Sequence, residues 1–114
     1  MKPKLKSKWI NALASGKYQQ ADGYLYQRNE DGKETYCCLG VLCIVAGKHI
    51  DGARADEVVE SGMELLNSAT LEQFGLTNDQ QQVLSAMNDG TSCNGIKYQK
   101  HTFHEIAQYI ENWL

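Results

Sequence analysis

The chain has 114 residues, of which 42% are hydrophobic and 22% charged, with a single proline. This composition predicts one globular domain over residues 1–114, because the apolar content is too high for a disordered chain and the glycines show no collagen-like repeat. The longest apolar run, 37–47, is far shorter than the roughly 18 residues of a membrane span, so we expect no membrane partner. A net charge of −3 disfavours nucleic acid as a partner.

The N-terminal segment is expected to form a helix that ends at Ser15-Gly16, because four apolar residues share one helical face: Leu5, Trp9, Ala12 and Leu13. The lysines around its start are interpreted as a solvated face: Lys2, Lys4, Lys6 and Lys8. The apolar stretch 9–15 is broken by Asn11 and is too short for an export signal. We therefore expect reduced thiols, in a cytosol, at the four cysteines: Cys37, Cys38, Cys43 and Cys93.

An antiparallel hairpin is predicted from segments 24–28 and 33–37, which are rich in residues that favour strands and flank the turn sequence Asn29-Glu30-Asp31-Gly32. The next segment, 38–47, is apolar on every side. Its length and the stop at Gly47 predict a central buried helix, with a buried strand as the alternative.

The second half of the chain contains further helix signals. A turn at 51–52 and a short helix at 53–60 are weakly indicated, and Asn67 or Ser68 can cap a helix that ends at Gly75 and carries Leu71 and Phe74 inward. The sequence Thr77-Asn78-Asp79-Gln80 is a capping box before a helix that places Val83, Leu84 and Met87 on one face. Asn88-Asp89-Gly90 closes it.

The last quarter begins with a polar segment, 91–101, in which an Asn94-Gly95 turn is compatible with a small surface ribbon. A second capping box, Thr102-Phe103-His104-Glu105, precedes an apolar stripe formed by Phe103, Ile106, Ala107, Ile110 and either Trp113 or Leu114. The predicted fold class is therefore α+β: one hairpin or small sheet packed against about four or five helices.

The cysteines and histidines do not predict a metal site. A zinc site from Cys37, Cys93, His101 and His104 is conceivable, but the chain has no Cys-x-x-Cys pair and adjacent cysteines aim poorly at one metal. Cys37 or Cys38, at the start of the central helix, is a weak candidate for a catalytic nucleophile, with His49, His101 or His104 as the partner imidazole. The favoured interpretation is that the thiols are structural. The common phosphate-binding and hydrolase motifs are absent from the sequence.

The approach to the hairpin is the best candidate for ligand binding, because it combines cations, phenols and an amide that could stack on a planar group and pair with an anion. The candidate residues are Lys17, Tyr18, Gln20, Arg28 and Tyr36, beside Tyr24 and Tyr26. The alternative is that they form only the ordinary outer face of a hairpin.

Four segments carry a recognisable pattern: 9–20, Tyr36-Cys37-Cys38-Leu39-Gly40-Val41-Leu42-Cys43, Met87-Asn88-Asp89-Gly90 and 102–111. Together they resemble a group of small proteins of unassigned activity encoded by tailed bacteriophages and prophages. Residues 91–101 are longer than the turn usual in that group, so they resemble an insertion.

The resemblance implies, by analogy of context, a phage accessory protein of the host bacterial cytoplasm that counteracts an anti-phage defence factor by binding. It would inhibit a defence protein through its acidic surface and the insertion, or sequester a nucleotide second messenger, and no cofactor is expected. The alternatives are a small cysteine-dependent enzyme and a regulatory interaction module without a defence role. A homo-oligomer is compatible with Trp9 and Trp113, which lie near the two termini and could leave apolar surface for another subunit.

Overall fold

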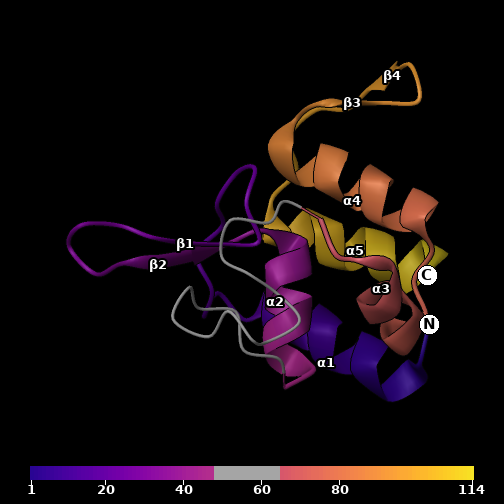
Figure 1. Cartoon of the computed structure of the whole chain (residues 1–114), viewed down its shortest axis with the longest axis horizontal. Coiled ribbons are helices and arrows are strands. Elements are labelled where there is room, and N and C mark those ends of the chain that lie inside the picture. The colour runs from indigo at the N-terminus through magenta and orange to yellow at the C-terminus, as the bar shows by residue number, and fades with distance from the viewer. Residues whose placement is uncertain (48–64) are drawn as a thin grey trace.

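The computed structural model describes residues 1–47 and 65–114. In these parts the chain forms α1 (Pro3–Ala14), α2 (Cys38–Val45), α3 (Ser68–Phe74), α4 (Asn78–Asp89) and α5 (Phe103–Trp113). Two antiparallel strand pairs accompany them, β1 (Tyr26–Arg28) with β2 (Glu34–Tyr36) and β3 (Ser92–Cys93) with β4 (Ile96–Lys97). The predicted α+β class is confirmed (Figure 1). The turn and helix expected at 51–60 lie outside the described residues.

The central element is α2, as its all-round apolar sequence predicts, and the alternative of a buried strand is wrong. Its residues from Cys38 to Cys43 are all buried, and the helix contacts both α1 and α4. Gly40 has a specific role here, because a Cβ at this position would overlap the backbone carbonyl oxygen of Leu25. The chain that leads into β1 can therefore lie directly against α2 only because residue 40 has no side chain.

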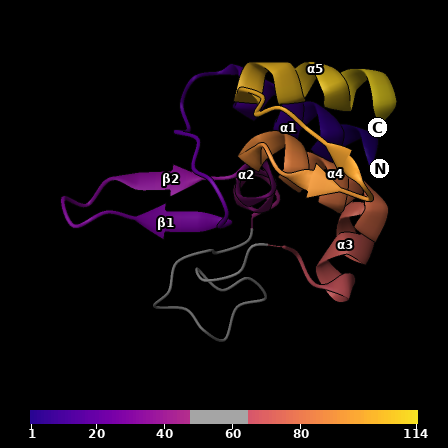
Figure 2. The ribbon, with the colours of Figure 1, turned by 90° about the horizontal axis from the view of Figure 1, so that it is seen from above.

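Helices α1 and α5 lie side by side and run in opposite directions, so that the two ends of the chain are close together (Figures 1 and 2). Trp9 is completely buried, and its indole N–H donates to the Cys38 carbonyl at 2.9 Å. The apolar stripe of α5 is buried as predicted at Phe103, Ile106, Ala107 and Ile110. Leu114 packs against the core at its end, whereas Trp113 is 73% exposed.

The helix boundaries follow the predicted signals. Thr77 and Thr102 each accept a hydrogen bond from the backbone N–H three residues on, and Gln80 and Glu105 each accept one from the N–H of their cap residue. Asn67, rather than Ser68, caps α3, and Gly75 ends it in the left-handed conformation. Both predicted capping boxes are therefore confirmed. None of the helices in the described part of the chain is long and apolar enough to cross a bilayer.

The two strand pairs are short and project from the helical body (Figure 1). In the first hairpin, the N–H of Asn29 donates to the Lys33 carbonyl and Gly32 takes a positive φ of 86°, which is typical of a tight loop with glycine at its last position. The β3–β4 ribbon turns at Asn94 and Gly95, both with positive φ, as a two-residue hairpin requires. The hairpin and the ribbon were both expected, although the hairpin strands are shorter than predicted.

Candidate functional site

One face of the β1–β2 hairpin gathers most of the residues that the sequence singled out. Tyr26 pairs with Tyr36 and Arg28 pairs with Glu34 across the two strands. Because side chains alternate between the two faces of a strand and directly paired residues share a face, these four side chains lie on the same face. We call this the hairpin face, with Lys17 and Tyr18 as its remaining members.

Three tyrosine rings form a continuous row on the hairpin face. The ring centroids of Tyr18 and Tyr36 are 5.5 Å apart in an edge-to-face arrangement, and those of Tyr26 and Tyr36 are also 5.5 Å apart. The Lys17 ammonium lies over the Tyr18 ring at 5.6 Å from its centroid. Tyr26 is buried, so the accessible part of the row is formed by the half-buried Tyr18 and Tyr36.

The segment before β1 joins this small sheet as a third strand-like piece. The N–H of Tyr36 donates to Gln19 O at 2.9 Å, and the N–H of Ala21 donates to Tyr36 O at 2.7 Å, in a parallel bridge. The edge of β2 at Tyr36 is thereby paired on both sides. The hairpin is held at its base by backbone hydrogen bonds as well as by the contacts between the tyrosine rings.

A buried polar cluster attaches this base to the helices, and Asn88 is its centre. The Asn88 side-chain oxygen accepts from the Gln20 amide at 3.0 Å and from the Cys38 N–H at 3.2 Å. Its nitrogen donates to Ala21 O and to the Asp89 carboxylate, each at 2.8 Å. Asn88 is completely buried, and these bonds connect α4 to the N-terminus of α2 and to the segment before the hairpin.

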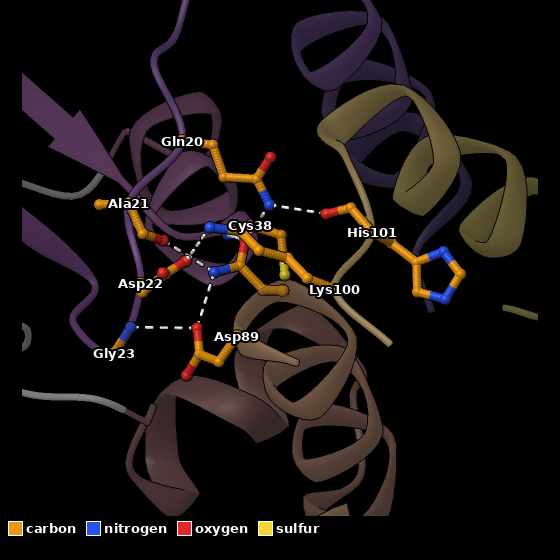
Figure 3. A network of polar contacts seen from close by, with 9 residues as sticks. Gln20, Ala21, Asp22, Gly23, Cys38, Asp89, Lys100 and His101 are labelled. Atoms are coloured by element: carbon orange, nitrogen blue, oxygen red, sulfur yellow. Dashed lines mark hydrogen bonds and ion pairs between the residues drawn. The ribbon is translucent and has the colours of Figure 1, made fainter. Parts of the chain in front are cut away.

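Further bonds extend the cluster toward the segment that precedes α5 (Figure 3). The Gln20 amide donates a second bond to His101 O at 2.8 Å, and the Asp89 carboxylate accepts from the Gly23 N–H at 3.0 Å. An exposed ion pair joins Lys100 and Asp22 at 2.7 Å. Because its main groups are already bonded within the chain, this cluster serves to position the hairpin rather than to receive a ligand.

The structure brings together four of the five predicted ligand-binding residues: Lys17, Tyr18, Arg28 and Tyr36. Gln20 does not join them, because its amide nitrogen donates inward to Asn88 and to His101 O. The amide nitrogen of Gln20 therefore has a structural role.

Cys37 and Cys38, the two candidate nucleophiles, are both buried. Cys37 is the N-cap of α2, as predicted, but burial raises the pKa of its thiol to about 12, although the Leu39 and Gly40 N–H groups act in the opposite direction. Burial also raises the pKa of Cys38, which is completely enclosed and whose thiol donates to Leu84 O. A catalytic thiol needs a lowered pKa and access to solvent, so this structure favours the structural interpretation. No disulfide joins any of the four cysteines, all of which lie in the described part of the chain.

The zinc ligands considered above are not gathered into a site. The described residues contain no group of three or more His, Cys, Asp or Glu side chains placed to hold a metal ion. The His101 imidazole instead lies 3.7 Å from the Glu105 carboxylate, and His104 is exposed on α5. His49 lies outside the described residues.

Two members of the hairpin face were not selected as site residues from the sequence. Tyr26 belongs to the phenols around the hairpin but not to the five predicted ligand-binding residues. Glu34 is absent from both sets, and its carboxylate accepts a hydrogen bond from the Tyr36 hydroxyl at 3.2 Å. Burial and the nearby Glu34 raise the pKa of Tyr36 to about 12. The strand alternation 26, 28 and 34, 36 was the signal that could have identified both residues.

Residues 1–72 match a protein family described as a domain of unknown function, DUF8296. The chain belongs to this family. The matched segment contains the whole hairpin face and both adjacent cysteines, whereas α4, the β3–β4 ribbon and α5 lie beyond it. No curated protein and no solved structure matches the chain.

Proposed function

We propose that this protein is a bacteriophage-encoded accessory protein that acts in the host bacterial cytoplasm, without catalysis, by binding and inhibiting an anti-phage defence protein. The phage context comes from the resemblance of four sequence segments to small phage and prophage proteins. The mode of action, binding, is supported by the structure of the hairpin.

The observation that carries the proposal is the β1–β2 hairpin, which projects from the helical body (Figure 2). Its face combines accessible tyrosines with cations, and backbone hydrogen bonds fix its base. Tyrosine and arginine are enriched among the residues that dominate protein interfaces. A hairpin that is already ordered loses little conformational entropy on binding, which favours affinity.

A protein partner fits this face better than a nucleotide. Tyr18 and Tyr36 contact each other edge to face, and the Lys17 ammonium already covers Tyr18, so the two rings leave no slot between them for a base. Gln20, which could have read the edge of a base, donates inward. Sequestration of a nucleotide remains the competing version, and the experiment below distinguishes the two.

The test combines infection with purification. Phage carrying or lacking the gene is plated on hosts with and without a defence system, and the tagged protein is then recovered from infected cells for mass spectrometry of bound proteins and extracted small molecules. The variant Tyr18→Ala with Arg28→Ala should abolish both protection and the bound protein. Gln27→Ala is the matched control, because Gln27 is exposed on the opposite face of β1.

Three results would overturn the proposal. If phage lacking the gene plates as well as phage carrying it on hosts with a defence system, the protein has no role against that defence. Protection by the double variant would show that the hairpin face is not the binding surface. A rise in melting temperature with cyclic or ADP-ribose-type nucleotides at about 1 mM, without any bound protein, would replace protein inhibition by nucleotide capture, because only a ligand of the folded state stabilises it.

A further inference from the structure

The hairpin face carries two cations that have no acidic partner in the described part of the chain. Lys17 lies over the Tyr18 ring and Arg28 is exposed on β1, and neither forms an ion pair with a described residue. Both cations lie next to the tyrosines. Lys17 is adjacent to Tyr18, and Arg28 is the next residue after Tyr26 on the same face of β1. The cationic groups are thus presented next to aromatic surface.

Glu34, the residue paired with Arg28 across the two strands, does not form an ion pair with it. Glu34 lies directly opposite Arg28 in the strand register, where a salt bridge is expected, but its carboxylate accepts the Tyr36 hydroxyl instead. The guanidinium therefore keeps its donors for another group.

We infer that the hairpin face recognises an acidic segment of its protein partner, in which an Asp or Glu carboxylate pairs with Arg28 and Lys17 and an adjacent apolar or aromatic side chain packs on Tyr18 and Tyr36. This inference rests on the proposed function and specifies the chemistry of the partner. Arginine binds a carboxylate through two parallel hydrogen bonds, which makes it the stronger of the two anchors. The two cations of the face are complementary in charge to an acidic segment.

A carboxylate of a protein segment suits this face better than the phosphate of a nucleotide. A nucleotide would need a stacking slot for its base as well as an anion site, and the contact between Tyr18 and Tyr36 occupies that space. A peptide side chain needs only the outer surface of the rings, which the two half-buried tyrosines offer.

The test uses the full chain and fluorescently labelled short peptides in anisotropy titrations. One peptide contains Asp, Glu and Trp, a second replaces its acids by Asn and Gln, and a third replaces them by Lys. The acidic peptide should bind, with affinity that falls as salt is added, and the other two should not. Arg28→Glu should weaken binding by about tenfold or more, because a charge-assisted pair becomes a repulsion.

The control is Lys33→Glu, which changes the net charge by the same amount on the same hairpin. Lys33 is adjacent to Glu34 in sequence, so its side chain points to the opposite face of the hairpin, and binding should change by less than about twofold. If Arg28→Glu and Lys33→Glu lose affinity for the acidic peptide equally, the loss comes from net charge alone and the inference is overturned.

Failure of the inference can be separated from failure of the proposed function. If the protein protects phage and captures a host protein, but Arg28→Glu and Lys17→Glu leave capture unchanged, the function stands and the acidic-segment inference is wrong. If inorganic phosphate or AMP competes with the acidic peptide and binds more tightly than it does, the anion on this face is a phosphate and the inference is also overturned. A neutral peptide that binds as well as the acidic one has the same consequence.

Discussion

Asn88 lies at the end of α4, where asparagine followed by Asp89 and Gly90 indicates only a helix stop, yet its side chain is completely buried. Four hydrogen bonds use both the oxygen and the nitrogen of its amide. Burying an amide lowers stability little when all of its hydrogen-bond partners are present. Removing the amide leaves those partners buried without a bond, and stability falls by the full cost of their desolvation. The position therefore tolerates few substitutions.

Replacement of Asn88 by alanine should lower the free energy of unfolding by about 3 kcal/mol, because the Cys38 N–H, the Ala21 carbonyl and the Gln20 amide lose a partner in a buried region. Urea unfolding of the variant measures this loss. Asn11→Ala, at an exposed position of α1, should change stability by less than about 0.5 kcal/mol. Similar values for the two variants would contradict the role given to Asn88.

The buried thiol of Cys37 should make the protein less stable in alkaline solution. Its pKa is raised from 9.0 to about 12 in the folded chain, and that of Tyr36 from 10.0 to about 12, so the unfolded chain releases these protons first. The stabilisation is fully present below about pH 9 and is lost as the pH rises toward about 12, by about 1.4 kcal/mol per pH unit for the buried thiol.

Urea unfolding between about pH 8 and about pH 10.5 measures this slope in the wild type and in Cys37→Ala. The variant should lose stability less steeply, although the substitution itself lowers stability at every pH. Parallel curves for the two proteins would show that the thiol is not the titrating group.

At the scale of elements, the sequence predicted best where a local signal was complete. The two capping boxes, the helix ends at Gly75 and Gly90 and the Asn94-Gly95 turn were all located, because each depends on neighbouring residues alone. The inward face of α4 was only partly predicted. Leu84 and Met87 are buried and Val83 is half-buried, but the buried Gln81 and Asn88 were missed, since their partners Leu66 and Gln20 are distant in sequence.

Substitution of Gly40 tests the close contact between α2 and the backbone of Leu25. In most helices a glycine-to-alanine change stabilises by up to about 1 kcal/mol, because alanine loses less entropy. Here Gly40→Ala should destabilise by about 2 kcal/mol or more, since the new methyl group would overlap the Leu25 carbonyl and force the hairpin approach away from α2.

Denaturant unfolding decides the sign of this effect. Ala14→Gly, at the exposed last residue of α1, provides an ordinary propensity cost of less than about 1 kcal/mol in the same protein. If Gly40→Ala is as stable as the wild type or more stable, the close contact between α2 and the Leu25 backbone does not constrain the fold. A variant that does not fold at all agrees with the prediction, provided that Gly40→Ser also fails.

Across the whole molecule, the sequence identified the fold class and most of the hairpin face but not the way in which they are connected. The face was found because Lys17, Tyr18, Arg28 and Tyr36 lie close together around one turn. The separation of Gln20 from that face could not be found, because it depends on Asn88, which lies 68 positions away. Long-range polar contacts of this kind leave no periodic pattern in a sequence.

The sequence also does not distinguish the two tryptophans, since both lie near a terminus and both were expected to offer apolar surface to a partner subunit. Trp9 is completely buried and its indole N–H donates to Cys38 O, so the expectation that Trp9 offers surface to a partner subunit is wrong. Trp113 remains 73% exposed and is the better candidate for self-association. Burial of its indole against a second copy would remove apolar area from water.

Quenching of tryptophan fluorescence by acrylamide can separate the two residues and test self-association at the same time. In Trp113→Phe, the remaining emission of Trp9 should be blue-shifted and almost unquenched, because its indole is completely buried and donates to Cys38 O on α2. In Trp9→Phe, Trp113 should be quenched strongly at low protein concentration. If the chain self-associates through α5, that quenching falls as the concentration rises, because mass action populates the assembly in which Trp113 is covered. Quenching of Trp113 that stays constant while sedimentation shows a growing oligomer would place the interface elsewhere.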